Sequence, residues 1–288
     1  MSTAQISLGA GRASERTSER AQLGTALAAT RARGLLVAAL LVLAGLAWWW
    51  TAERMRGMDA GPGTDLGGFA WFVGVWVVMM AAMMFPAVAP TVALYSAMTR
   101  RSGASRPLLF ASSYLLVWAL AGVGAYGGYR LGRSALGSEL GWQRGGRWAA
   151  AGVLALAALY EVTPLKDACL RRCRTPVGFM LGSWREGVRG ALELGALHAA
   201  WCLGCCWALM AALFALGVMS VAWMALVAAL ITLEKTLPWR RAVIWGTGAL
   251  LLALAVLVAA SPSAVPALTI PGSAHARGAM QSMGMGMH

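Results

Sequence analysis

The chain has 288 residues, of which 59% are hydrophobic and 12% are charged, and its formal net charge is +13. So small a charged fraction, with so large a hydrophobic one, excludes an ordinary soluble domain and favours an integral membrane protein. Lys and Arg lie mainly in short segments between apolar runs, where they orient a membrane protein, so we predict no nucleic-acid partner. The sequence thus predicts an all-α, polytopic transmembrane helical bundle in the lipid bilayer.

The chain divides into three parts by composition. Residues 1–33 are polar and Arg-rich and are predicted to form a disordered basic N-terminal tail. Residues 34–260 form the predicted transmembrane helical domain, and residues 261–288 a Met/His-rich C-terminal tail. About seven spans are predicted within the domain, at 34–50, 69–98, 108–129, 148–162, 190–216, 219–237 and 242–260. The fourth run is short, so six spans are the alternative.

The distribution of basic residues predicts the orientation. With the N-terminus in the cytoplasm, 17 of the 24 Lys and Arg residues fall on the cytoplasmic side and 7 on the outer side. We therefore expect a multi-pass protein of the cell inner membrane with a periplasmic C-terminus. Glu234 and Lys235 end the sixth run, so they are expected at the cytoplasmic boundary, where the lysine can extend toward water.

The second run contains paired methionines, in the segment WVVMMAAMMFPAVAP. The pairs have a spacing of four residues, so their thioethers can converge on one face of a helix. Neutral, soft thioethers select copper(I) over zinc, although methionine also serves as an adaptable core residue. Two prolines follow and are expected to disturb the helix. The candidate copper ligands here are Met79, Met80, Met83 and Met84.

Two cysteines lie among cations in the segment expected to connect the fourth and fifth runs, EVTPLKDACLRRCRTPVGF. Cys169 and Cys173 have a spacing of four residues, and nearby cations favour the thiolate, which is the metal ligand and the nucleophile. The pair is a candidate site for copper(I) delivery or for redox exchange. A basic loop on anionic lipid with incidental cysteines is the alternative.

The fifth run, GALHAAWCLGCCWALM, carries the most informative pattern. At about 100° per residue, Cys202, Cys205 and Cys206 lie about 40°, −20° and 80° around a helix from His198, so all four share one face. Imidazole and thiolate groups bind copper(I) and zinc. His198 and Cys202 are one turn apart, whereas Cys205 lies about 10 Å beyond His198. Two overlapping sites therefore fit better than one compact site, with buried packing residues as the alternative.

The last nine residues, MQSMGMGMH, form a third cluster of soft ligands. Glycine spacers allow thioethers in such a tail to close on one ion without a fold. The predicted orientation places this tail outside the cell, where it can gather copper. Its candidate ligands are Met283, Met285, Met287 and His288.

Four motifs occur in order across residues 69–238: MMAAMMFP, TPLKDACLRRCRTP, HAAWCLGCCWALM and LEKTLP. Together they resemble a bacterial family of predicted metal-binding integral membrane proteins of unknown function. The resemblance implies a polytopic inner-membrane protein that binds a metal, with copper favoured. Ala199 stands where glycine is expected in that family.

The sequence favours a metal-handling membrane protein that binds copper(I), with zinc as the second metal. Its role would be copper transport, storage or delivery to a periplasmic copper protein or a cuproenzyme. The sequence contains no Walker A, D-K-T-G-like or H-E-x-x-H motif, so we predict no enzyme activity, although thiol redox activity is compatible with the cysteines. A membrane thiol–disulfide protein and a structural or assembly subunit of a membrane complex are the alternatives.

Overall fold

The computed structural model describes residues 34–56, 62, 66–99, 105–137, 142–271, 273–274 and 276–278. These residues form helices and contain no β-strand, which confirms the all-α prediction. An N-terminal helix, Gly34–Met55, precedes the labelled elements. The labelled helices are α2 (Phe69–Met98), α3 (Ser105–Leu136), η3 (Trp142–Gly146), α4 (Arg147–Glu161), α5 (Pro164–Arg174), α6 (Pro176–Ser183), α7 (Gly187–Leu216), α8 (Val221–Thr236), α9 (Arg240–Ala260) and η4 (Pro262–Ala264).

Five of the described helices are long and apolar enough to cross a membrane. They are the N-terminal helix, α2, α3, α7 and α9, and the bent pair α4–α5 raises the number to six if it forms one span. Five or six candidate spans are fewer than the seven predicted, and the run that falls short is the sixth rather than the fourth, which our six-span alternative had left out. The sixth predicted run corresponds to α8, whose 16 residues are fewer than the roughly 20 that span a bilayer.

The segment that we interpreted as a connection between the fourth and fifth runs is largely helical. Thr163 accepts a hydrogen bond from the backbone of Lys166 and caps α5, and Pro164 occupies the first turn. The axis turns by 66° between α4 and α5. The loop conformation in our second alternative for this segment was wrong, because this capping signal starts a helix that packs against α7. Its contact with anionic lipid stays a prediction.

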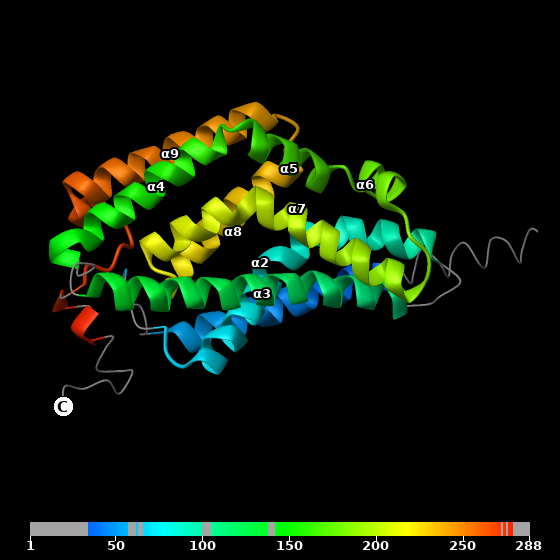
Figure 1. The fold of residues 1–288 in the computed structure, drawn as a ribbon, viewed down its shortest axis with the longest axis horizontal. Helices are drawn as coiled ribbons and strands as arrows, with labels where there is room; N and C mark the ends of the chain where they lie inside the picture. The colour runs from blue at the N-terminus through cyan, green and yellow to red at the C-terminus, as the bar shows by residue number, and fades with distance from the viewer. Residues whose placement is uncertain are drawn as a thin grey trace, which may run out of the picture.

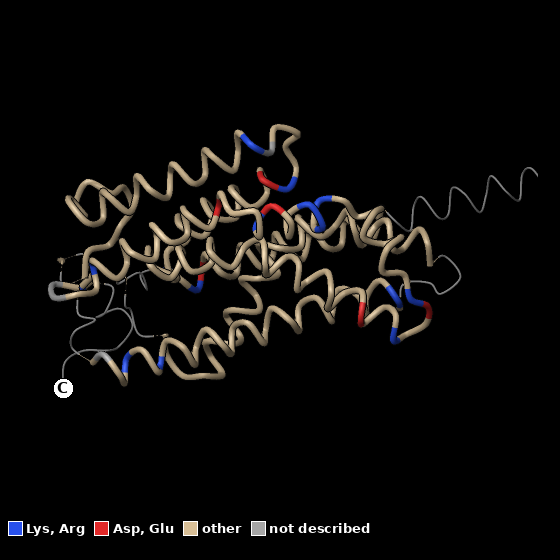
Figure 2. Tube along the Cα trace, turned by 45° about the horizontal axis from the view of Figure 1, so that its top comes forward, with Lys and Arg blue, Asp and Glu red and all other residues tan. Residues whose placement is uncertain are grey.

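The helices form an elongated bundle in which α4 and α9 lie side by side and α3 runs along α7 (Figure 1). Charged residues are sparse along the chain (Figure 2). Large apolar side chains are instead exposed on the outer surface, and Leu120, Leu156 and Val256 are exposed by 62%, 66% and 59%. Such a surface is unfavourable in water and suits contact with lipid.

Helix α7 lies at the centre, in contact with α3, α4, α5 and α8. Gly195 allows the close approach of α3, since a Cβ at this position would overlap Phe110 O and Ser113 Oγ. Small residues at such crossings let membrane helices pack closely. Helix α2 packs against α3, and Trp76 Nε1 donates a hydrogen bond to Trp118 O at 2.8 Å. Contrary to our expectation, α2 continues through Pro86 and Pro90 without a break.

Candidate metal centre

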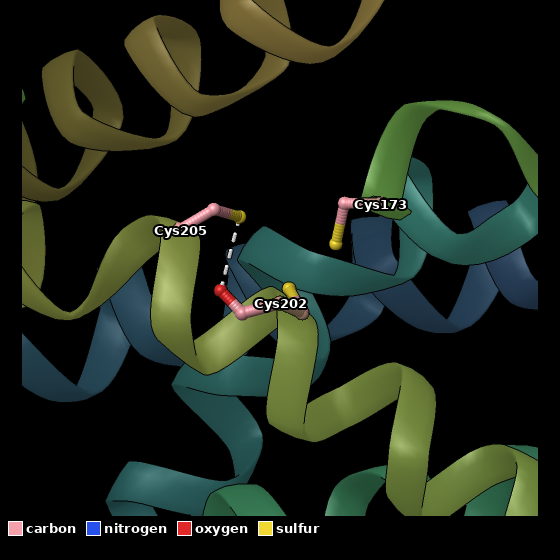
Figure 3. A group of neighbouring side chains, drawn as sticks. All are labelled: Cys173, Cys202 and Cys205. Atoms are coloured by element: carbon pink, nitrogen blue, oxygen red, sulfur yellow. Dashed lines mark hydrogen bonds between the residues drawn. The ribbon is translucent and has the colours of Figure 1, made fainter. Parts of the chain in front are cut away.

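Three cysteine thiols from two helices come together in the centre of the bundle. Among the described residues, Cys173, Cys202 and Cys205 form a group whose sulfur atoms all lie within 4.8 Å of one another. Figure 3 shows Cys173 on α5 pointing toward Cys202 on α7, with Cys205 one turn further along α7. All three side chains are buried. We call these three residues the thiol cluster.

Cys202 has the most polar contacts in the thiol cluster. The ammonium group of Lys235 on α8 donates a hydrogen bond to Cys202 Sγ at 3.0 Å. The hydroxyl group of Tyr114 on α3 lies 3.1 Å from the same sulfur, also within hydrogen-bonding distance. An ammonium group and a hydroxyl group that can donate to the same sulfur favour its thiolate form, which is the form that binds metals.

Cys205 and Cys206 complete the row of cysteines on α7. The Cys205 thiol donates a hydrogen bond to Cys202 O at 3.1 Å, drawn as a dashed line in Figure 3. Its sulfur lies 3.4 Å from Cys206 Sγ. Cys206 is buried and touches the edge of the thiol cluster through this contact. All five cysteines are free thiols.

The imidazole of His198 lies among aromatic rings, outside the thiol cluster. The ring centroid is 5.1 Å from that of Phe179 and 6.0 Å from those of Phe110 and Tyr114. The residue is buried, and its Nδ1 atom has no hydrogen-bond partner in the described part of the chain. A metal-binding role for His198 stays a prediction.

Cys169 lies one turn before Cys173 but packs elsewhere on α7. A Cβ at Gly204 would lie 2.9 Å from Cys169 Sγ, so the glycine makes room for this thiol. The Tyr160 hydroxyl donates a hydrogen bond to Gly204 O at 2.6 Å and covers the same place. Cys169 therefore packs α5 against α7, and it is not a member of the thiol cluster.

The four candidate ligands of α2, Met79, Met80, Met83 and Met84, are buried, as a core or ligand role requires. Met83 lines a cavity together with Trp48 and Thr232, between α2, α8 and the N-terminal helix. Their role as thioether ligands stays a prediction. The basic tail, residues 1–33, and the C-terminal ligands lie outside the described residues, so their predictions also stand on sequence alone; these ligands are Met283, Met285, Met287 and His288.

Two neighbours of Cys202 were missed by the sequence analysis. We expected Lys235 to extend toward water, but its side chain turns inward to the sulfur. Tyr114 gave no signal, because a tyrosine in an apolar run is ordinary at a membrane interface. The motif LEKTLP was the available hint for Lys235, since a lysine within an apolar helix needs a partner.

A buried group of thiols with an adjacent ammonium binds soft cations, because thiolates prefer copper(I), zinc and related ions. The fold and the site thus define a bundle of apolar helices with a buried group of thiols that could hold a soft metal ion. The sequence model of the PpoB2 family, described as a copper chaperone, matches residues 73–258. The chain therefore belongs to the PpoB2 copper chaperone family. No curated protein and no solved structure matches the chain.

Proposed function

We propose that the protein is a copper chaperone of the bacterial inner membrane that holds copper(I) in the thiol cluster. The observation that carries this proposal is the approach of Cys173, Cys202 and Cys205 to within 4.8 Å from two separate helices. Thiolate ligands favour copper(I), and membership of a copper chaperone family supports copper over zinc. Copper is the cargo of the protein in this proposal, and the protein is not an enzyme.

The charge of Lys235 suits a buried copper(I) complex. One copper(I) ion and two thiolates together carry a charge of −1, which is unfavourable in an apolar bundle. The ammonium group 3.0 Å from Cys202 Sγ makes the total neutral. Lys235 is thus a positioning residue that lowers the cost of burying the complex, and Tyr114 restrains the same sulfur.

The direction of cargo movement is part of the proposal. With the N-terminus in the cytoplasm, the Met/His-rich tail gathers copper(I) in the periplasm. The methionines of α2 then supply thioether ligands on the path of the ion from the tail to the thiol cluster, and His198 supplies an imidazole near that cluster. The acceptor is a periplasmic copper protein or a cuproenzyme, recognised by its own thioether, thiolate or imidazole ligands.

Copper stoichiometry in matched variants tests the proposal. Detergent-purified protein is loaded anaerobically with copper(I), washed with a chelator, and compared with Cys202→Ala and Cys169→Ala. Cys169 is the control, because it is a buried cysteine on the same helix as Cys173 but outside the thiol cluster. We expect Cys202→Ala to lose about one equivalent and Cys169→Ala to retain it. Equal copper in all three proteins would contradict the proposal.

A membrane thiol–disulfide protein is the second candidate. The observation in its favour is the 3.4 Å distance between Cys205 Sγ and Cys206 Sγ. A disulfide between adjacent residues is strained, and strained disulfides are easily reduced. Intact-protein mass measured after mild oxidation distinguishes the two: a reversible loss of two hydrogens without bound copper supports redox chemistry.

A further inference from the structure

A second buried polar cluster lies at the bend between α4 and α5. The ammonium of Lys166 contacts Glu161 Oε2 and, at 2.9 Å, Glu234 Oε2. The side chains of Glu161 and Lys166 are 0% exposed and that of Glu234 is 3% exposed. Two carboxyl groups from α4 and α8 therefore share one ammonium group from α5. We call these three residues the carboxyl–lysine triad.

The second oxygen atoms of both carboxyl groups are left without partners. Glu161 Oε1 and Glu234 Oε1 are buried and have no hydrogen-bond partner within the described residues. Their Oε2 atoms contact the same ammonium group, which holds the two carboxyl groups close together. If both were ionised, the triad would carry an uncompensated charge of −1 in an apolar interior, at a cost of several kcal/mol.

No second cation from the described residues of the neighbouring helices contacts the two carboxyl groups. Lys166 is the one cation that contacts the two carboxyl groups in the described part of the chain. From α9, Gly248 lies against Glu161, and the neighbouring Thr247 has a buried hydroxyl for which the described residues offer no hydrogen-bond partner. Lys235 follows Glu234 in the sequence, but its ammonium donates to Cys202 on α7.

We propose that Glu161 and Glu234 share one proton and that this proton-binding site is coupled to the thiol cluster. A proton taken from water onto one carboxyl oxygen gives that group a donor for the other and makes the triad neutral. Two buried carboxyl groups that face a single ammonium hold one proton in this way, because a second ionised carboxyl group has no cation to pair with. The proton site stands on the triad alone, whereas the coupling rests on the proposed copper function.

The ligand of this site is a proton and not a metal ion. The ammonium of Lys166 already occupies the space between Glu161 Oε2 and Glu234 Oε2, so a metal cation there would be repelled. A proton needs no such space, because it lies along the line between two oxygen atoms. Carboxylate oxygens are also poor ligands for the soft copper(I) ion.

Two helices connect the triad to the thiol cluster. Lys166 and Cys173 are both on α5, seven residues and about two turns apart, and therefore on the same side of the helix. On α8, Glu234 is the neighbour of Lys235, which contacts Cys202. Copper(I) binding that shifts Cys173 or the Lys235 ammonium therefore also shifts Lys166 or Glu234. This movement changes the affinity of the triad for the shared proton.

Infrared spectroscopy detects a protonated carboxyl group directly, independently of copper. The carbonyl stretch of a carboxylic acid is separate from that of a carboxylate, and it shifts in D2O when the proton exchanges. In the copper-free protein at neutral pH, we expect one such band from a buried group, and we expect Glu161→Gln and Glu234→Gln each to remove it. Glu193→Gln is the matched control, because Glu193 is half-exposed and paired with Arg185 at 2.7 Å.

Each outcome decides a separate part of the proposal. The absence of a buried carboxylic acid band in the wild-type protein, or a band that survives both substitutions, would overturn the proton site. With the band present, anaerobic copper(I) loading is expected to shift it or remove it. A band that copper loading leaves unchanged, in protein that has bound copper, would overturn the coupling. Failure to bind copper at all would overturn the proposed function while leaving the proton site intact.

Discussion

The thiol cluster and the methionine pairs of α2 are two groups of soft, buried ligands that arise in different ways. The methionines lie on one helix, and their spacing alone brings pairs of them onto one face. The cysteines lie on two helices, and Cys173 reaches Cys202 and Cys205 because α5 turns back against α7. Ligands on two helices can surround an ion from two sides, and the packing of those helices fixes the distances between the ligand atoms. The cluster is therefore the better candidate for holding copper, and the methionines are better suited to passing it on.

The largest expected effect concerns Cys202, the member of the thiol cluster with two polar partners. Replacing Cys202 by Ser removes the sulfur that Tyr114 and Lys235 stabilise. We expect the copper(I) affinity to fall by more than about a hundredfold, beyond the range typical of residues outside the ligand set. Competition with a copper(I) chelator measures the affinity, and a loss under tenfold would remove Cys202 from the ligands.

A smaller effect is expected from the cation beside the cluster. Lys235→Met keeps the apolar stem but removes the charge next to Cys202. We expect a loss of about tenfold in copper(I) affinity, within the range for residues that support a metal ligand. Lys235→Arg is the control and should retain most of the affinity. Equal losses in both variants would indicate a packing role for the side chain.

The next prediction concerns stability, which depends on the close packing of α3, the helix of Tyr114, against α7. Gly195→Val places a branched side chain where Phe110 O and Ser113 Oγ lie, so α3 and α7 must separate. We expect a destabilisation of about 1–3 kcal/mol, as for an overpacked core. Thermal unfolding in detergent measures it. Gly74→Val in α2 is the control, because a Cβ there meets no atom within 4 Å.

The smallest effect is expected in α2. Substituting Met79 and Met83 by Leu conserves volume, which costs under about 1.5 kcal/mol for each residue. The amount of copper retained by the thiol cluster should stay the same, while the rate of copper transfer to a chelator should fall if the thioethers pass the ion. Elemental analysis and stopped-flow transfer measure the two quantities. A lower copper content would place the methionines among the holding ligands.

The apolar runs predicted the helices because their length and hydropathy follow directly from the bilayer. The second run coincides with α2, and the fifth is within three residues of α7. The row of cysteines on α7 was also predictable, since residues on one helix are related by a fixed angle. The sequence did not predict the contact of Cys173 with α7 or the inward turn of Lys235, because both depend on how separate helices pack against each other.

The central claim is that sulfur atoms from α5 and α7 bind one copper(I) ion together. X-ray absorption at the copper edge of the wild-type protein and of Cys173→Ser, each loaded anaerobically with one equivalent and washed with a chelator, tests it most directly. We predict sulfur ligands in the wild type and one sulfur ligand fewer in Cys173→Ser. An identical sulfur coordination in both proteins, or a first shell of nitrogen and oxygen in the wild type, would contradict the claim.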